Sequence, residues 1–180
     1  MIGEEEEGQH GTALAANGFD LVLTVSQREI PLEKRHPGIR YSFIPLRDEP
    51  NFRMDFFMHR ASEELSRSQG RALVHCVAGI SRSPSIYLGH RLLTDPQASL
   101  EKEMGRLSRL RPQINPNIGF FYQLKLLDAF PFHLRINRRV YFAILALADQ
   151  CCCMHRLLYI GRTMLHLALI YWFRKATGGW

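Results

Sequence analysis

Cysteine is scarce in the first 150 residues of this 180-residue chain, which hold only Cys76, while the other three cysteines stand together at residues 151–153. A disulfide framework needs cysteines in pairs that can reach one another, and Cys76 has no such partner within its own part of the chain. The sequence therefore argues against a fold held together by disulfides and leaves Cys76 available for chemistry.

Long uncharged apolar runs are also missing. The two apolar stretches near the end of the chain, residues 140–148 and 163–173, are both shorter than the roughly 18 residues that a membrane-spanning helix needs. Residues 4–7 are glutamates, where a secretory signal would have positive charge followed by an apolar run. We therefore expect no membrane span and no secretion, and we expect a cytoplasmic protein with the nucleus as a second compartment.

An excess of positive charge is absent from the first 130 residues. They hold sixteen lysines and arginines against sixteen aspartates and glutamates, so the net charge of +6 comes entirely from residues 131–180. A nucleic-acid module would carry a basic face interleaved with aromatic side chains, and the sequence has no such stripe. We therefore expect no nucleic-acid partner.

Apolar residues follow alternating strand and helix patterns through residues 11–130. Short runs rich in β formers predict strands at residues 19–26, 39–46 and 71–75. Apolar residues at helical spacing predict a helix over residues 52–68, and Gly70, just past residue 68, is the stop signal. This alternation is typical of a sheet with helices between its strands.

Three further helices are predicted where a capping side chain stands directly before a proline. The pairs are Ser83–Pro84, Asp95–Pro96 and Asn115–Pro116, and the helices should reach about residues 93, 110 and 130. Strands that alternate with helices usually pair in parallel and are covered by those helices. The sequence therefore predicts an α/β fold with a mainly parallel central sheet flanked by helices.

The loop between the third predicted strand and the next helix reads HCVAGISRSP, residues 75–84. If the strand ends at His75 and the helix begins at Ser83, the loop must curl so that its backbone N–H groups point at one centre. Such a nest binds anions, helped by the positive end of the following helix. Arg82 adds a planar two-pronged donor that matches two phosphate oxygens. The loop therefore predicts a phosphate site.

The same local field acts on Cys76. A thiol beside a helix N-terminus and an arginine loses its proton more readily than a free cysteine does, so a thiolate can persist at neutral pH. Attack of that thiolate on a bound phosphate monoester would give a phosphocysteine, with the backbone donors and Arg82 stabilising the transition state. Ser83 could donate a hydrogen bond to the sulfur and help it leave when water attacks.

The leaving group of such a reaction needs a proton from a carboxylic acid on a separate loop. Asp48, just past the second predicted strand, is our choice, and Glu49 and Asp55 are competitors. From the residues alone, all three can also be read as parts of a solvated turn and a helix cap.

The stretch VHCVAGISRSP, together with IPLRDEP upstream and RPQINPNIGFFYQL downstream, resembles the small, atypical dual-specificity phosphatases of the cysteine-based protein tyrosine phosphatase superfamily. The resemblance covers residues 11–128. It implies that Cys76 is the nucleophile, that Arg82 binds the phosphate, that Ser83 assists departure of the thiolate, and that Asp48 is the general acid.

The resemblance also implies two supporting residues. His75 matches a position that tunes and orients the loop, and Asn117 matches an asparagine that braces it. Their plain structural readings are a strand-end histidine and a helix cap. The phosphate would be bound by the Arg82 side chain and by backbone donors of the loop interior; together these residues are Val77, Ala78, Gly79, Ile80, Ser81 and Arg82.

The loop interior VAGIS contains no lysine or arginine, although phosphoinositide-selecting relatives often place positive charge there. A phosphoprotein substrate is therefore favoured, and the family's shallow pocket implies that phosphotyrosine and phosphoserine or phosphothreonine all fit. Two alternatives stay open: a non-catalytic phospho-binding module, and a phosphatase of RNA 5′ ends or lipids. We expect no cofactor and no metal.

Three segments are expected along the chain: an acidic stub over residues 1–10, the catalytic domain over residues 11–130, and a basic apolar tail over residues 131–180. The resemblance implies a strand pair before the matching part. Because the stub stands in its place, we expect an incomplete sheet edge.

The tail, residues 131–180, allows several readings. It could lie on a membrane surface as an amphipathic basic segment, pack on the domain as an added helix, or have no stable fold. The three adjacent cysteines at residues 151–153 cannot readily converge on one metal ion. Their apolar, basic surroundings would suit palmitoylation instead.

Overall fold

The structure is a computed structural model that describes residues 2–3 and 10–129. The predicted tail, residues 131–180, lies outside the described residues, and so do its expected membrane-surface contact and its three cysteines. Residues 4–9 of the predicted acidic stub also lie outside them.

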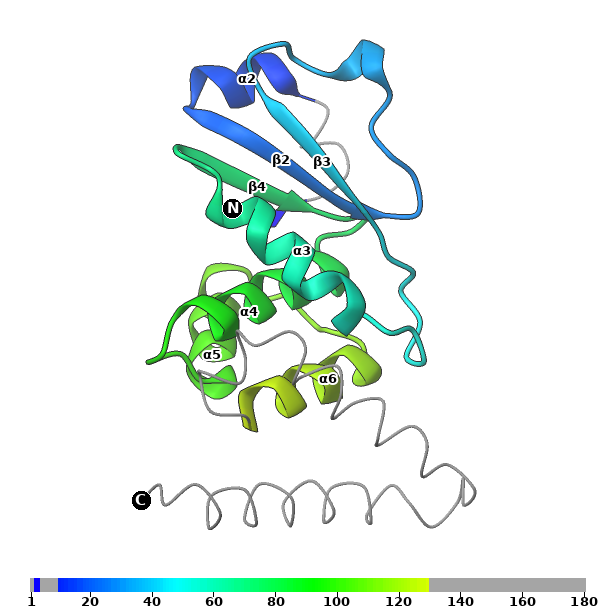
Figure 1. The fold of residues 1–180 in the computed structure, drawn as a ribbon, viewed down its shortest axis with the longest axis vertical. Coiled ribbons are helices and arrows are strands. Elements are labelled where there is room, and N and C mark those ends of the chain that lie inside the picture. The colour runs from blue at the N-terminus through cyan, green and yellow to red at the C-terminus, as the bar shows by residue number, and fades with distance from the viewer. Residues whose placement is uncertain (1, 4–9, 130–180) are drawn as a thin grey trace. The chain divides into compact units, whose positions relative to one another are not determined.

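The described residues form a four-stranded sheet in the order β1-β4-β2-β3 (Figure 1). The strands are β1 (Ile2–Gly3), β2 (Phe19–Ser26), β3 (Arg40–Pro45) and β4 (Arg71–His75). Every strand pair is parallel. The predicted α/β fold with a mainly parallel sheet is therefore confirmed; β2 and β4 have the predicted bounds, and β3 is one residue shorter at each end.

The acidic stub contains a strand that the sequence analysis does not predict. Ile2 pairs with Val74 and Gly3 with His75, so β1 extends the sheet beyond β4. The expected incomplete edge is thus partly filled by β1. A strand of two residues is too short to show an alternating apolar pattern. The four glutamates that follow it make the segment look like an acidic, exposed stretch.

Five α-helices and one short 3-10 turn lie in the described part of the chain. They are α2 (Gly11–Ala16), η1 (Leu32–Lys34), α3 (Asp55–Ser66), α4 (Arg82–Thr94), α5 (Leu100–Leu110) and α6 (Ile118–Ala129). The sequence predicts α3 to α6 but not α2, because six residues are too few to show a helical period. None of the helices in residues 10–129 is long and apolar enough to cross a membrane.

Capping residues differ from those predicted for the later helices. The N-cap of α4 is Ser81 and that of α5 is Ser99, whose hydroxyl oxygen accepts the N–H of Lys102 at 3.3 Å. Asp95 instead accepts the N–H of Gln97 at 2.8 Å, which makes a local turn. Each proline therefore lies near the start of its helix, but the cap itself lies a few residues from the predicted one.

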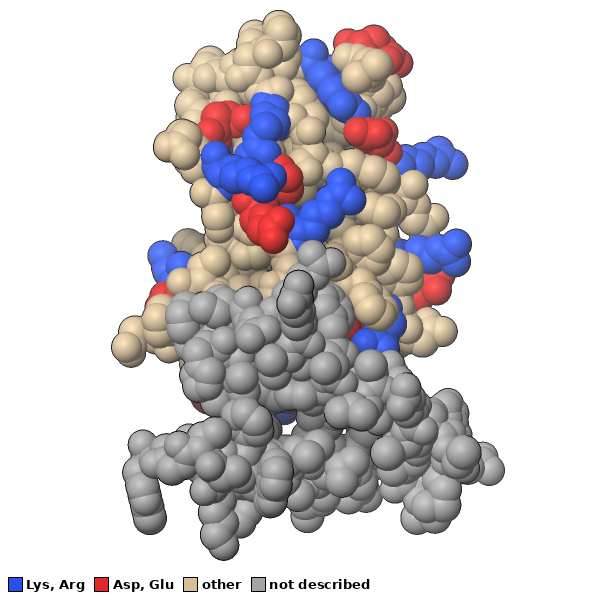
Figure 2. All heavy atoms as spheres, viewed as in Figure 1, with Lys and Arg blue, Asp and Glu red and all other residues tan. Residues whose placement is uncertain are grey.

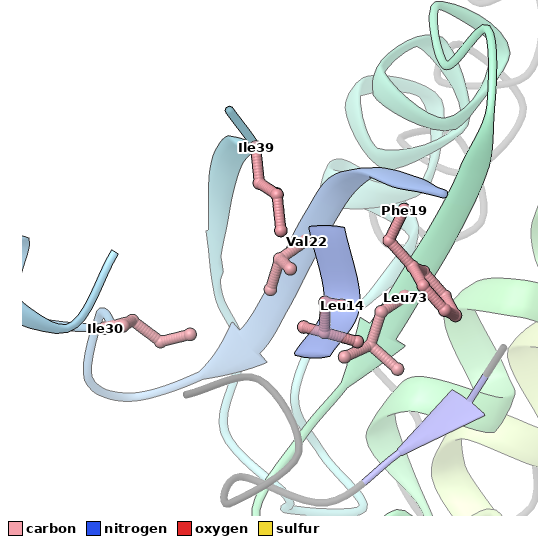
Figure 3. Packing of buried hydrophobic residues seen from close by; sticks show 6 residues of the cluster. All are labelled: Leu14, Phe19, Val22, Ile30, Ile39 and Leu73. Carbon is pink, nitrogen blue, oxygen red and sulfur yellow. The ribbon is translucent and has the colours of Figure 1, made fainter. Parts of the chain in front are cut away.

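Both faces of the sheet are covered. Leu21, Val22 and Leu23 are each 0% exposed, although successive residues of a strand point to opposite faces. On one face a cluster packs beneath α2, as Figure 3 shows; its members are Leu14, Phe19, Val22, Ile30, Ile39 and Leu73. Helices α3 and α4 pack on the sheet from the other side (Figure 1).

Close packing of α3 on α4 holds the second helix in place. A Cβ atom added to Gly89 of α4 would lie 1.9 Å from the sulfur of Met58, a buried residue of α3. Glycine therefore lets the two helices approach one another, and this contact helps to position α4, whose first turn follows the Cys76 loop.

Charges of both signs lie side by side on the face drawn in Figure 2. Ion pairs of the described residues include Glu64, which pairs with Arg40 and, at 3.1 Å, with Arg67. Pairs of this kind neutralise charge locally.

Candidate active site

The Cys76 loop and Asp48 follow two strands of the same parallel sheet. The loop begins where β4 ends, at His75, and Asp48 comes three residues after β3 ends at Pro45. Both strands flank β2 and run parallel to it, so the carboxyl ends of β3 and β4 lie at the same end of the sheet (Figure 1). The fold thus brings together two segments that lie far apart in the sequence.

Cys76 lies against the first turn of α4. Its side chain is 1% exposed, and its Sγ lies 3.2 Å from the Oγ of Ser83, the second residue of the helix. The partial positive charge of a helix N-terminus favours an anion at this position. The predicted contact between Cys76 and Ser83 is present.

Gly79 gives the loop its tight curvature. Its φ of +66° is a left-handed conformation that other residues rarely adopt. A Cβ atom here would also lie 2.6 Å from Nη2 of Arg111 and 3.0 Å from the carbonyl oxygen of Gly3. The loop backbone is therefore packed closely against both Arg111 and β1.

Arg82 and Asp48 face one another across the site. The Nε of Arg82, a residue only 8% exposed, lies 3.5 Å from Oδ2 of Asp48. Oδ1 of Asp48 accepts hydrogen bonds from the hydroxyl of Ser81 at 2.6 Å and from Nδ2 of Asn117 at 2.8 Å. The carboxylate is thus held beside the arginine that is predicted to bind phosphate.

The two competing carboxylates have other surroundings. Asp55 is 2% exposed and accepts two hydrogen bonds from Arg53, at 2.9 and 2.8 Å. Glu49 is exposed and lies in a turn, in which the backbone carbonyl oxygen of Glu49 accepts the N–H of Phe52 at 3.0 Å. Of the three candidates, Asp48 is therefore the one that the structure places beside Arg82.

His75 anchors the start of the loop to the neighbouring strand. It is 0% exposed, and its Nε2 lies 2.8 Å from Oγ1 of Thr24 on β2. The sequence analysis singles out His75 but misses Thr24. A threonine between Leu23 and Val25 of a buried strand is the signal that could have found it, because a buried hydroxyl needs a hydrogen-bond partner.

Asn117 satisfies both of its sequence readings. As a helix cap, its Oδ1 accepts the N–H of Phe120 at 3.0 Å. As a brace, its own N–H donates to the hydroxyl oxygen of Ser81 at 3.1 Å, while Nδ2 donates to Asp48. One residue thus joins the start of α6 to the loop and to the carboxylate.

Ser81 contributes its side chain, whereas the sequence analysis expects only a backbone donor there. Its hydroxyl stands between Asp48 and the N–H of Asn117, and its carbonyl oxygen accepts the hydroxyl of Ser85 at 2.7 Å. By contrast, Val77 and Ile80 expose their side chains, to 49% and 38%. These two apolar side chains therefore make no polar contact in the site.

The segment that carries Asp48 rests on α6 at two further points. Gln123 donates from Nε2 to the carbonyl oxygen of Phe52 at 2.9 Å and accepts the N–H of Asp55 on Oε1 at 3.1 Å. A Cβ atom added to Gly119 would lie 1.7 Å from the carbonyl oxygen of Pro50. Neither residue was singled out from the sequence, although a glutamine within the apolar run GFFYQL indicates a polar partner.

Within residues 2–3 and 10–129, the structure has no group of three or more His, Cys, Asp or Glu side chains that could hold a metal ion.

A sequence model of the family described as "Dual specificity phosphatase, catalytic domain" matches residues 2–129. The chain therefore belongs to the dual-specificity phosphatase family, and the predicted resemblance is confirmed. The match begins at the residues of β1, before the start at residue 11 that the sequence analysis gives to the resemblance.

Among its relatives, dual specificity protein phosphatase 12 of Mus musculus is 34% identical over 128 residues, which are 69% of this chain and 38% of the relative. Dual specificity protein phosphatase 18 of Homo sapiens is 34% identical over 114 residues, 62% of this chain and 59% of the relative. The chain thus spans less than two thirds of the length of these relatives.

The fold is similar to that of DUSP15, whose crystal structure superposes on this chain with a TM-score of 0.67 at 24% sequence identity. The superposed part is 78% of this chain and 88% of the DUSP15 chain. This likeness supports the assignment of the fold.

Proposed function

We propose that this chain is a phosphoprotein phosphatase that hydrolyses phosphotyrosine and phosphoserine or phosphothreonine through a phosphocysteine intermediate. The observation that carries the proposal is the position of the Cys76 sulfur, at the first turn of α4, in a loop whose Arg82 faces Asp48 at 3.5 Å. This arrangement supports the proposal that Cys76 is the nucleophile, Arg82 the anion-binding cation and Asp48 the proton donor. Membership of the family supports the same class of reaction.

In the first step, the thiolate of Cys76 attacks phosphorus and the bond from phosphorus to the leaving oxygen breaks. Arg82 and the backbone N–H groups of residues 77–82 stabilise the charge on the other phosphate oxygens. Asp48 gives its proton to the leaving oxygen, so that an alcohol or phenol departs instead of an alkoxide or phenolate.

In the second step, water attacks phosphorus and the bond from sulfur to phosphorus breaks. Asp48, now ionised, takes the proton from the water, and inorganic phosphate is released. Ser83, whose Oγ lies 3.2 Å from the sulfur, donates a hydrogen bond that stabilises the departing thiolate. His75 and Asn117 act indirectly, since the first anchors the loop to β2 and the second holds Ser81 and Asp48.

The substrate is proposed from the loop interior, residues 77–81, which carries no lysine or arginine. Without an added cation, the site offers little to select a highly charged lipid headgroup, and a singly phosphorylated side chain fits its charge. We infer that the protein acts in the cytoplasm, with the nucleus as a second compartment, because cytosolic thiol systems keep a nucleophilic cysteine reduced.

The replacement Cys76→Ser tests the assignment most directly. We expect the full chain to hydrolyse an aryl phosphate in the presence of a metal chelator, and we expect the variant to lose at least 10³-fold in kcat, because a serine hydroxyl is not ionised at neutral pH. Release of inorganic phosphate measures both. A panel of phosphopeptides, phosphoinositides and 5′-triphosphorylated RNA then separates the substrate classes.

The unfolding midpoint of Cys76→Ser should match that of the parent protein, which separates lost chemistry from lost structure. Turnover that survives in a folded Cys76→Ser protein would refute the phosphocysteine mechanism.

A second candidate is a module that captures phosphorylated proteins without turnover. The observation that favours it is the set of contacts around Asp48, which accepts hydrogen bonds from Ser81 and Asn117 and forms an ion pair with Arg82. These contacts give the carboxylate a structural role in the loop that needs no proton transfer. Binding of a phosphopeptide by the parent protein, with no release of phosphate, would favour this candidate.

A further inference from the structure

The two oxygens of the Asp48 carboxylate have different surroundings. Oδ1 accepts two hydrogen bonds, from Ser81 at 2.6 Å and from Asn117 at 2.8 Å. Oδ2 instead faces Nε of Arg82 at 3.5 Å, a separation too long for a good hydrogen bond. The carboxylate is therefore held by one oxygen and directs the other toward the arginine.

The directions of the hydrogen bonds on Oδ1 follow from groups that can only donate. The backbone N–H of Asn117 donates to the Ser81 hydroxyl oxygen, which leaves the single hydroxyl proton of Ser81 to point at Asp48. Similarly, the N–H of Phe120 donates to Oδ1 of Asn117, so the other end of that amide is the NH2 group. Both partners of Oδ1 are thus donors.

Two donors fill the acceptor sites of Oδ1 and leave no room for a proton on that oxygen. A protonated Asp48 must therefore carry its proton on Oδ2. Oδ2 is also the oxygen on the side of Arg82, where the phosphate and its leaving oxygen would lie.

We propose that Ser81 is a positioning residue for the general acid: its hydroxyl holds Oδ1 of Asp48, so that Oδ2 is the oxygen that protonates the leaving group. The inference rests on the proposed function and assigns to it a side chain from the phosphate loop itself. Because Ser81 directly precedes Arg82, the same short segment sets the position of the phosphate and that of the acid.

The test compares two substrates for the full-length Ser81→Ala variant. Phenyl phosphate has a poor leaving group that needs a proton, whereas an aryl phosphate with a strongly acidic phenol leaves almost unaided. We expect kcat for phenyl phosphate to fall about tenfold, a part of the roughly 10²-fold or greater contribution of a well-placed acid. For the activated substrate we expect less than a twofold change, with KM little altered for both.

Three further variants sharpen the comparison. Ser81→Thr keeps a hydroxyl and should recover most of the lost rate. In an Asp48→Asn background, Ser81→Ala should have no additional effect on phenyl phosphate, because the acid is already absent. Ser62→Ala is the matched control: this serine is 7% exposed, against 8% for Ser81, and contacts His90 instead of Asp48.

Equal slowing of both substrates by Ser81→Ala would overturn the inference, because it would indicate general damage to the loop. A crystal structure of Ser81→Ala gives a second reading that does not need activity. The Asp48 carboxylate should rotate away from its place beside Arg82, and an unchanged carboxylate would also overturn the inference. If the parent protein shows no hydrolysis, and the Asp48 carboxylate nevertheless rotates in the Ser81→Ala crystal structure, Ser81 holds the carboxylate as inferred. In that case it is the proposed function that fails.

Discussion

At the scale of single residues, one buried contact joins the reactive loop to the sheet. His75, directly before Cys76, lies 2.8 Å from the hydroxyl of Thr24, and the two residues are 0% and 3% exposed. Buried polar groups of this kind cost free energy when one partner is removed, since the other is left without its hydrogen bond. Thr24 therefore supports the site without facing it.

We predict that Thr24→Val destabilises the protein by about 1–3 kcal/mol, the usual cost of leaving a buried polar group without its partner. Urea unfolding followed by circular dichroism measures the change. Thr94→Val is the matched control, because Thr94 is exposed and bonds only to a helix carbonyl, that of His90 at 2.8 Å. Similar losses in the two variants would contradict a special role for the contact.

Cys76, Arg82 and Ser83 could be proposed from the sequence because they lie within one short segment. Cys76 and Ser83 meet across a single loop, so a strand before it and a helix after it predict their contact. The parts played by Ser81 and Gln123 depend on segments far away in the chain, and a polar residue shows only that some partner is needed. The choice of Asp48 over Asp55 likewise depended on the family resemblance until the coordinates placed both.

At the scale of elements, α6 acts as a support for the segment that carries Asp48. Gly119 lets the carbonyl oxygen of Pro50 approach the helix, and Gln123 bonds to the backbone on either side of Arg53. The segment that carries Asp48 is thus held from two directions, by the Cys76 loop and by α6.

We predict that Gly119→Ala destabilises the protein by about 1–3 kcal/mol, as overpacking usually does, because the new methyl group would push against backbone atoms of Pro50. Turnover of phenyl phosphate should fall more than that of an activated aryl phosphate, because Asp48 moves with its segment. Thermal unfolding and the two kcat values measure these effects.

Gly105→Ala provides the control for this substitution. Gly105 is also helical, and nothing lies within 4 Å of the added Cβ, so the change should stabilise the protein by up to about 1 kcal/mol through helix propensity alone. A gain in stability for Gly119→Ala would contradict the prediction, because it would mean that the backbone at Pro50 moves aside at little cost in free energy.

Elements with a clear apolar pattern could be predicted, and short ones could not. The bounds of β2 and β4 match the expectation because both are apolar runs with sharp ends. By contrast, β1 and α2 are shorter than the period that would reveal them. The caps of α4 and α5 depend on local geometry, which the order of serine, aspartate and proline does not determine.

At the scale of the whole molecule, stability should depend on pH through His90. This half-buried residue of α4 has Nδ1 at 2.9 Å from the hydroxyl oxygen of Ser62. Burial, and secondly the charge of Arg91, lower the pKa of His90 below its ordinary value of 6.5. Below pH 6.5 the unfolded chain therefore binds a proton more readily than the folded protein does.

The contribution of His90 to stability should be complete above pH 6.5 and should be lost as the pH falls through the lowered pKa. We predict that the urea midpoint declines between pH 7.5 and pH 5 by less in His90→Gln than in the parent protein. The exposed His10 supplies the control, since His10→Gln should keep the parent's decline. A decline that does not change in His90→Gln would contradict the prediction.

The short strand β1 lies directly behind the reactive loop. The carbonyl oxygen of Gly3 accepts the N–H of Cys76 at 3.4 Å and also lies against Gly79. Displacing Ile2 and Gly3 would therefore remove the acceptor of the Cys76 N–H and the packing partner of Gly79. We therefore expect additions that displace β1 to disturb the Cys76 loop, while the same additions elsewhere on the surface need not.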